Sequence, residues 1–301
     1  MCGIVGLFSK SSAVSERLGD HLAAMLVQLG DRGPDSAGVA VYRDPVPDGS
    51  CKVSLFSHRR DYDWAALGAE LAAELGGDGH PEVRATHAVF VLDSDADVVA
   101  EHLRDNHPDV RLMSAGREIE IYKEAGPPGD VVAQFGLGDM QGSHALGHTR
   151  MATESRVTTE HSHPFSTGLD LCLVHNGSLS NHNILRRELR REGIAFQTDN
   201  DTEVAAGYLT WRLREGDSLE AALERCLDDL DGFYTFAVGT RDGFAVLRDP
   251  IACKPAVLAE TDEWVAMASE YRAIAELPGA DDAEVWEPAP ARVYVWERER
   301  V

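Results

Sequence analysis

Cys2 is the residue whose position most directly suggests chemistry in this chain. If Met1 is removed, Cys2 becomes the N-terminal residue and carries a thiol nucleophile together with an α-amine base. An ordinary thiol has a pKa of about 8.5 and a terminal amine one of about 7.7–8.0, so the amine can take up the thiol proton near neutral pH. A cysteine after Met1 is usually just an N-terminal residue, so its meaning depends on its companions.

Three further positions could complete a reaction centre. Arg150 ends a predicted strand, and its guanidinium fork suits a carboxylate, although a lone arginine often forms a surface salt bridge. Asn176-Gly177 could supply an amide and a backbone N–H to an oxyanion hole, although this dipeptide is also a common hairpin turn. Asp201 could accept an ammonium group or cap a helix. Together these groups predict hydrolysis of an amino acid's side-chain amide, with glutamine as the obvious substrate.

The elements that must hold these residues follow from hydrophobic periodicity. Helices are expected at 15–30, 63–76, 95–106, 130–138, 183–192, 203–215 and 218–230. Strands are expected at 4–8, 38–42, 86–93, 145–150, 169–174, 233–239, 243–248, 256–260, 264–268 and 293–296, with a hairpin over 110–123. The strand at 169–174 is expected to break at His175. Helices bracketed by strand runs predict antiparallel sheets with helices packed outside.

Composition limits the function further. Of 301 residues, 44% are hydrophobic, and no apolar run is long enough for a membrane span. No signal peptide is expected, and five widely spaced cysteines without a C-x-x-C pair argue against a disulfide framework or a cysteine zinc site, which fits a cytoplasmic protein. With 28 basic and 51 acidic residues, the net charge of −23 disfavours nucleic-acid binding. The acidity favours a halophile's surface over an ordinary acidic protein.

Six ordered motifs resemble one known family. They are Met1-Cys2-Gly3-Ile4-Val5-Gly6, Arg32-Gly33-Pro34-Asp35-Ser36-Ala37-Gly38, Gly147-His148-Thr149-Arg150, His163-Pro164-Phe165, His175-Asn176-Gly177 and Asp201-Thr202-Glu203. In this order they resemble the class II glutamine amidotransferase domain, the N-terminal-nucleophile hydrolase module of glutamate synthase and amidophosphoribosyltransferase. The resemblance implies an α+β, four-layer αββα sandwich over 1–301. A small inserted βαββ subdomain, about 60–122, lies outside the usual pattern.

The resemblance also implies roles for individual residues. Cys2 would form a γ-glutamyl thioester, with Asn176 and Gly177 as the oxyanion hole. The expected substrate-binding residues are Arg150 for the α-carboxylate, Asp201 for the α-ammonium group, Thr153 and His163 in the pocket wall, and Arg32 as a buttress of the terminus. Met151 departs from relatives that carry an aromatic residue after the arginine, so the lid over glutamine differs. No metal or cofactor is implied.

Only about 25 residues follow the expected sandwich, so we expect no acceptor domain. The chain most resembles stand-alone amidotransferase subunits of split glutamate-synthase-like systems, including the A subunit of N-methylglutamate synthase. This implies a separate synthase that receives the ammonia, expected to be an FMN protein of the glutamate synthase type. Two alternatives stay open: a non-catalytic subunit that senses glutamine, and an amidase for another γ-glutamyl or amide substrate.

Overall fold

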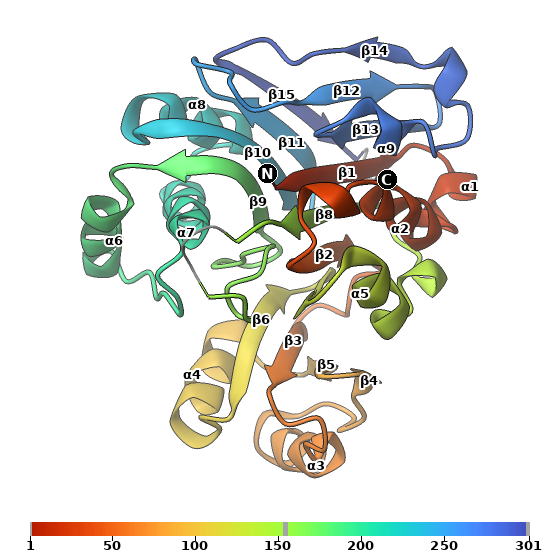
Figure 1. Ribbon diagram of the computed structural model, residues 1–301. Helices are drawn as coiled ribbons and strands as arrows, with labels where there is room; N and C mark the ends of the chain where they lie inside the picture. Colours follow the sequence, from red (N-terminus) through yellow and green to blue (C-terminus); the bar gives the residue numbers. More distant parts are fainter. Residues whose placement is uncertain (1, 153–155, 299–301) are drawn as a thin grey trace.

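The computed structural model describes residues 2–152 and 156–298, and its centre is a large antiparallel sheet (Figure 1). Within these residues the sheet has seven strands in the order β14-β12-β13-β1-β8-β2-β7. Their bounds are β1 Gly3–Ser9, β2 Ser36–Tyr42, β7 Ile119–Ala125, β8 His144–Arg150, β12 Val257–Glu260, β13 Trp264–Ala268 and β14 Glu284–Trp286. β1 therefore lies in the interior of the sheet, between β13 and β8.

A second antiparallel sheet packs against one face of the first. In the described chain it has four strands in the order β15-β11-β10-β9. Their bounds are β9 Cys172–Leu179, β10 Gly232–Thr240, β11 Gly243–Arg248 and β15 Arg292–Glu297. Side chains alternate across a strand, so Ile4 and Phe8 of β1 join the core between the sheets, where Val174 and Phe244 meet them.

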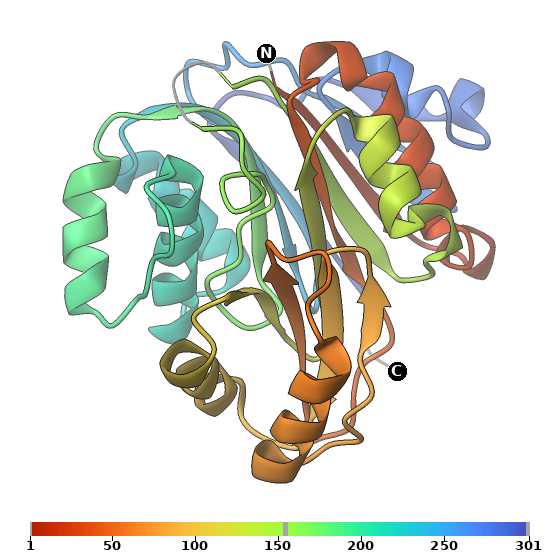
Figure 2. The same ribbon diagram turned by 60° about the horizontal axis from the view of Figure 1, so that its bottom comes forward.

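Helices cover the two outer faces of the paired sheets. Val5 and Leu7, on the other face of β1, contact the helices that cover the large sheet. These helices are α1 Ser12–Ser15, α2 Leu18–Gln28, α5 Pro128–Phe135 and α9 Tyr271–Ile274. The smaller sheet is covered by α6 His182–Arg191, α7 Asp201–Arg214 and α8 Leu219–Asp229. Figure 2 shows the two helix groups on opposite sides, which confirms the predicted αββα sandwich.

A third sheet extends from the sandwich, at the bottom of Figure 1. Among the described residues it has four antiparallel strands in the order β4-β5-β3-β6. Their bounds are β3 Cys51–Ser57, β4 Glu82–Arg84, β5 His87–Leu92 and β6 Val110–Gly116, and the helices α3 Trp64–Leu75 and α4 Ala96–Asn106 pack on them in a separate apolar cluster. Its treatment as an insertion into the family fold stays a prediction.

The predicted hairpin over 110–123 is wrong. β6 pairs with β3 in the third sheet, whereas β7 pairs with β2 in the large sheet. The buried carboxylate of Asp170 accepts backbone N–H bonds from Arg117, Glu118 and Ile119, at 2.8–3.1 Å. Because the Asp170 side chain, about 50 residues away in the sequence, accepts these backbone N–H groups, the turn can leave one sheet and enter the other.

Other differences also come from tertiary contacts. The strand expected to break at His175 continues to Leu179, since β9 pairs with β10 along its whole length. The sequence predicts irregular structure with some β character over residues 44–60, which contain β3, and β3 carries the polar residues Lys52 and Ser54. Both are buried, and β7 supplies their partners: Lys52 Nζ lies 3.0 Å from a Glu120 carboxylate oxygen, and Ser54 Oγ accepts the Ile121 N–H. Within the described ranges, three 3-10 turns occur, at Gly30–Arg32, Leu137–Asp139 and Ala280–Asp282. β14 and α9 are short elements with no periodic pattern.

Candidate active site

Cys2 precedes β1, and two side chains from distant segments fix its backbone. The Cys2 carbonyl oxygen accepts hydrogen bonds from Arg32 Nε at 3.1 Å and from Asn176 Nδ2 at 3.2 Å. The thiol-bearing residue is partly exposed. Three of the residues predicted for the site are therefore brought together from positions 2, 32 and 176.

The start of β1 has no room for a larger residue after Cys2. A Cβ on Gly3 would lie 2.7 Å from Thr149 Oγ1 and 2.9 Å from Leu29 Cβ. Thr149 is the partner of Gly3 in the pairing of β1 with β8, and its hydroxyl donates to the Leu29 carbonyl at 3.1 Å. A glycine here lets the side chains of Thr149 and Leu29 approach the backbone closely next to Cys2.

Arg32 is held by a carboxylate that the sequence did not identify as part of the site. Arg32 Nη1 forms an ion pair with Glu270, and the hydrogen bond from Arg32 is the main cause of the lowered pKa of Glu270. The residue before it, Ser269, exchanges two 2.9 Å hydrogen bonds with the backbone of Ile4, with its hydroxyl accepting and its N–H donating. Arg32 thus holds Cys2 just before β1, and Ser269, next to Glu270, holds Ile4 within β1.

Arg150 ends β8 and is buried, with 5% of its surface exposed. Its Nη1 donates to the Arg156 carbonyl at 3.0 Å. Burial lowers the pKa of Arg150, and the nearby Cys2 and Asp35 oppose this shift. A buried cation beside the Cys2 thiol suits a carboxylate ligand.

Asn176 and Gly177 lie inside β9, opposite Thr235 and Tyr234 of β10, and so do not form a hairpin turn. Gly177 has φ +150°, and a Cβ there would lie 2.0 Å from the Phe233 carbonyl oxygen. Only glycine fits this backbone. The strand is therefore distorted directly beside the amide that reaches Cys2.

Asp201 begins α7 but is not its N-cap. That position is taken by Asn200, whose side chain accepts the Thr202 N–H at 2.8 Å. One carboxylate oxygen of Asp201 accepts the Leu179 N–H at 2.9 Å, and the other lies 3.8 Å from His175 Nδ1. The helix-cap interpretation of Asp201 is thus replaced by a link to the end of β9.

Behind these groups lies a layer of buried histidines that the sequence did not predict as a unit. The Thr202 hydroxyl lies 2.7 Å from His163 Nε2 and 3.0 Å from His175 Nδ1. His148 stacks on His163 with ring centroids 4.0 Å apart, and its Nε2 donates to the His175 carbonyl. Burial lowers the pKa of all three, that of His148 to about 3. The layer is therefore uncharged at neutral pH.

Two further residues, His163 and Thr153, were predicted to line the pocket. His163 makes its contacts in the histidine layer, with Thr202, His148 and Phe165, so it supports the site from within. Thr153 lies outside the described residues. The only sequence signals for this layer are the motifs themselves, because no local pattern links residues 148, 163 and 175.

Comparisons with known proteins agree with this geometry. A glutamine amidotransferase domain model matches residues 148–276. Over its full length the chain is 57% identical to the "Glutamine amidotransferase-like protein GlxB" of Rhizobium meliloti, of which it covers 99%. It is 32% identical to a "Putative glutamine amidotransferase" of Methanothermobacter thermautotrophicus, with 98% of this chain and 99% of that protein covered. The chain belongs to the class II glutamine amidotransferase family.

The fold of this amidotransferase is shared with a solved structure of lower identity. Glutamine phosphoribosylpyrophosphate amidotransferase from B. subtilis superposes with a TM-score of 0.62 at 21% identity. The superposition covers 99% of this chain and 48% of that one. None of the helices in the described ranges is long and apolar enough to cross a bilayer.

Proposed function

We propose that this amidotransferase hydrolyses L-glutamine to glutamate and ammonia through a γ-glutamyl thioester on Cys2. The observation that carries the proposal is the Asn176 amide, which donates to the carbonyl of Cys2 from 3.2 Å. A side-chain amide has two N–H donors, so Asn176 can hold the nucleophile's backbone and still face a developing oxyanion. The neighbouring N–H of Gly177 would be the second donor.

The proposed chemistry begins once Met1 has been removed. The free α-amine takes the thiol proton, and the Cys2 sulfur attacks the side-chain amide carbon of glutamine. The oxyanion is stabilised at Asn176 and Gly177, and it collapses when the amine returns the proton to the leaving nitrogen, which departs as ammonia. Water then attacks the thioester, and glutamate leaves as the thiol regains its proton.

We propose that the two charged groups of the amino acid bind separately. Arg150 would receive the α-carboxylate, because it is a buried cation near Cys2. Asp201 would receive the α-ammonium group, because its side chain keeps 23% exposure. Arg32 would not contact glutamine but would hold the Cys2 backbone together with Glu270.

We further propose that the ammonia passes to a separate synthase subunit, with an FMN protein of the glutamate synthase type as the candidate. Supporting this, the chain spans 99% of the GlxB relative but only 31% of the amidophosphoribosyltransferase of Archaeoglobus fulgidus that it matches. Affinity purification of the tagged chain tests the partner. Recovery of a stoichiometric synthase without flavin would contradict the FMN assignment.

The first test of the reaction is covalent labelling. The protein is treated with diazo-oxo-norleucine, an electrophilic glutamine analogue, with and without excess glutamine, and its peptides are analysed by mass spectrometry. We expect one adduct on a peptide that begins at Cys2 and lacks Met1, prevented by glutamine. The exposed Cys253 is the internal control and should stay unmodified.

Two outcomes would redirect the proposal. An unmodified N-terminus that retains Met1 would remove the α-amine base, and glutamine binding without turnover would then favour a sensing subunit. An adduct on Cys2 that glutamine does not prevent would favour an amidase for a different γ-glutamyl or amide substrate. Activity across a panel of amides would identify that substrate.

A further inference from the structure

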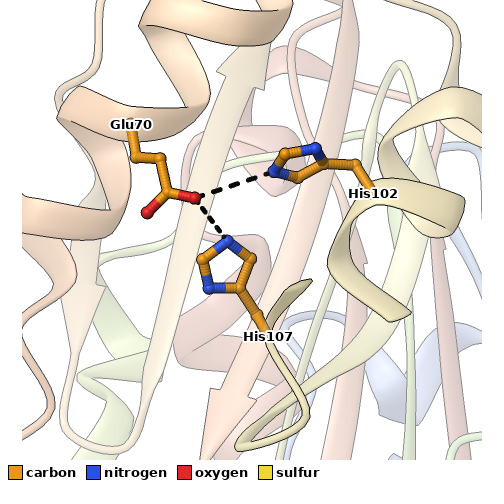
Figure 3. Close-up of side chains that lie close together, drawn as sticks. All are labelled: Glu70, His102 and His107. Carbon is orange, nitrogen blue, oxygen red and sulfur yellow. Dashed lines mark hydrogen bonds and ion pairs between the residues drawn. The ribbon is translucent and has the colours of Figure 1, made fainter. Parts of the chain in front are cut away.

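A cluster of two histidines and a glutamate lies on the third sheet, far in the sequence from the residues of the proposed reaction. Glu70 comes from the middle of α3, His102 from α4, and His107 from the C-terminal cap of α4. Figure 3 shows the three side chains pointing toward one another. Their potential ligand atoms all lie within 4.8 Å of one another, and the described part of the chain contains no second group of this kind.

The distances match the spacing of ligands around a small cation. Glu70 Oε1 lies 2.9 Å from His107 Nε2 and 3.9 Å from His102 Nε2. Tetrahedral zinc has Zn–N and Zn–O distances of about 2.0–2.1 Å, which puts its ligand atoms about 3.3 Å apart. Small side-chain adjustments would therefore bring all three atoms onto one ion.

The second nitrogen of His102 has a carboxylate neighbour, as ligating histidines usually do. His102 Nδ1 lies 3.4 Å from a carboxylate oxygen of Glu74, one helical turn beyond Glu70 on α3, and 3.4 Å from Asn106 Nδ2, which also donates to the His102 carbonyl at 3.0 Å. A ligating histidine usually gives its other N–H to such a carboxylate, which fixes the tautomer and directs the remaining lone pair at the metal. Glu74 is thus the carboxylate that would hold the His102 ring in a ligating orientation.

The other ring nitrogen of His102, Nε2, is buried and forms no hydrogen bond with the described residues. In the tautomer that carries its proton on Nδ1, toward Glu74, the lone pair of His102 Nε2 faces the carboxylate of Glu70. Two acceptors that face each other need a cation between them. Buried polar atoms are normally satisfied, so this exception points to a missing ligand.

We propose that Glu70, His102 and His107 bind Zn²⁺, with Glu74 as the positioning carboxylate. Two imidazoles and one carboxylate suit zinc and disfavour Mg²⁺, which prefers oxygen ligands. The side chains of His102 and His107 are only 12% and 13% exposed, whereas that of Glu70 is 45% exposed and leaves the fourth position open to water. The ion would link α3 directly to α4 where both pack on the third sheet. This link would be independent of glutamine hydrolysis.

The test is zinc binding by the full-length protein after chelator treatment, measured by equilibrium dialysis and metal analysis at pH 7.5. We expect the double variant His102→Ala/His107→Ala to lose one equivalent of bound Zn²⁺ relative to the unmodified protein. His80→Ala, which removes an exposed histidine from the same unit, is the matched control and should lose none. Excess Mg²⁺ should not displace the ion.

Two conservative variants keep the test valid if the double variant folds poorly. Glu70→Gln removes a ligand charge from a partly exposed position, and Glu74→Gln removes only the positioning carboxylate. Each should weaken zinc binding by about tenfold or more.

A second readout follows from the link between the helices. Zinc should slow amide hydrogen exchange in α3 and α4 of the unmodified protein and of His80→Ala, but not of the double variant. Equal stoichiometry and affinity in the unmodified protein, the double variant and Glu70→Gln would overturn the proposal. So would exchange in α3 and α4 that zinc leaves unchanged.

Discussion

Acidification from pH 7 to pH 5 should strongly destabilise the folded protein, because several buried histidines are held uncharged. His87, His144 and His148 are fully buried, and burial lowers the pKa of each to about 3. In the unfolded chain the same groups titrate near a pKa of about 6.5. Between these values the unfolded state binds protons that the folded state does not, so stability is lost as the pH falls.

The expected magnitude follows from the two pKa values. One such histidine costs about 2 kcal/mol of unfolding free energy at pH 5, because each unit between the pH and the unfolded pKa corresponds to about 1.4 kcal/mol. Three of them cost about 6 kcal/mol, which is a large part of the 5–15 kcal/mol typical of a folded domain. His163 and His175, whose pKa values are also lowered by burial, act in the same direction.

Urea unfolding at pH 7, 6 and 5, followed by tryptophan fluorescence, measures this loss. His144→Gln removes one of the three groups, so its loss between pH 7 and 5 should be about 2 kcal/mol smaller than that of the unmodified protein. His80→Gln changes an exposed histidine and should leave the loss unaltered. A total loss below about 2 kcal/mol, or an identical loss in His144→Gln, would refute the reasoning.

Three further predictions concern residues of the proposed active site. Asn176→Ala should lower kcat for glutamine about 10²–10³-fold with little change in KM, since it removes an oxyanion donor; an unchanged kcat in steady-state assays would contradict this. Gly177→Ala, with its Cβ 2.0 Å from the Phe233 carbonyl, should lose more than about 2 kcal/mol of stability in urea unfolding. Glu270→Gln should lower kcat about tenfold or more by loosening Arg32. Arg272→Gln, which removes the ion pairs of Arg272 with Glu270 and Asp31 but leaves that of Arg32, should not.

Several buried strands of the sandwich were predictable because each is an apolar run in its own sequence. The bounds of β11 and β13 match the predicted 243–248 and 264–268, and β1 follows from four apolar residues between glycines and a serine. A strand buried on both faces is a continuous apolar run, and such runs are visible without knowledge of the neighbours. The motif residues Cys2, Arg32 and Asn176 were found for a different reason, their order along the chain.

The parts that were missed depend on partners far away in the sequence. Glu270 meets Arg32 across 238 residues, and the Asp170 side chain turns the chain at Arg117 across 53. No local periodicity encodes such pairs, because each partner alone is an ordinary polar residue. The same holds for the zinc ligands, since Glu70 and His102 lie on separate helices.

The uncharged histidine layer has a direct consequence for how the proposed site would recognise its substrate. Glutamine carries one carboxylate and one ammonium group, and Arg150 and Asp201 are their proposed counter-charges. His175 Nδ1 lies 3.8 Å from Asp201, so an imidazolium there would compete with the ammonium group for the same carboxylate. Burial prevents this by lowering the pKa of His175. The burial that makes the fold sensitive to acid would therefore also keep Asp201 available to the substrate.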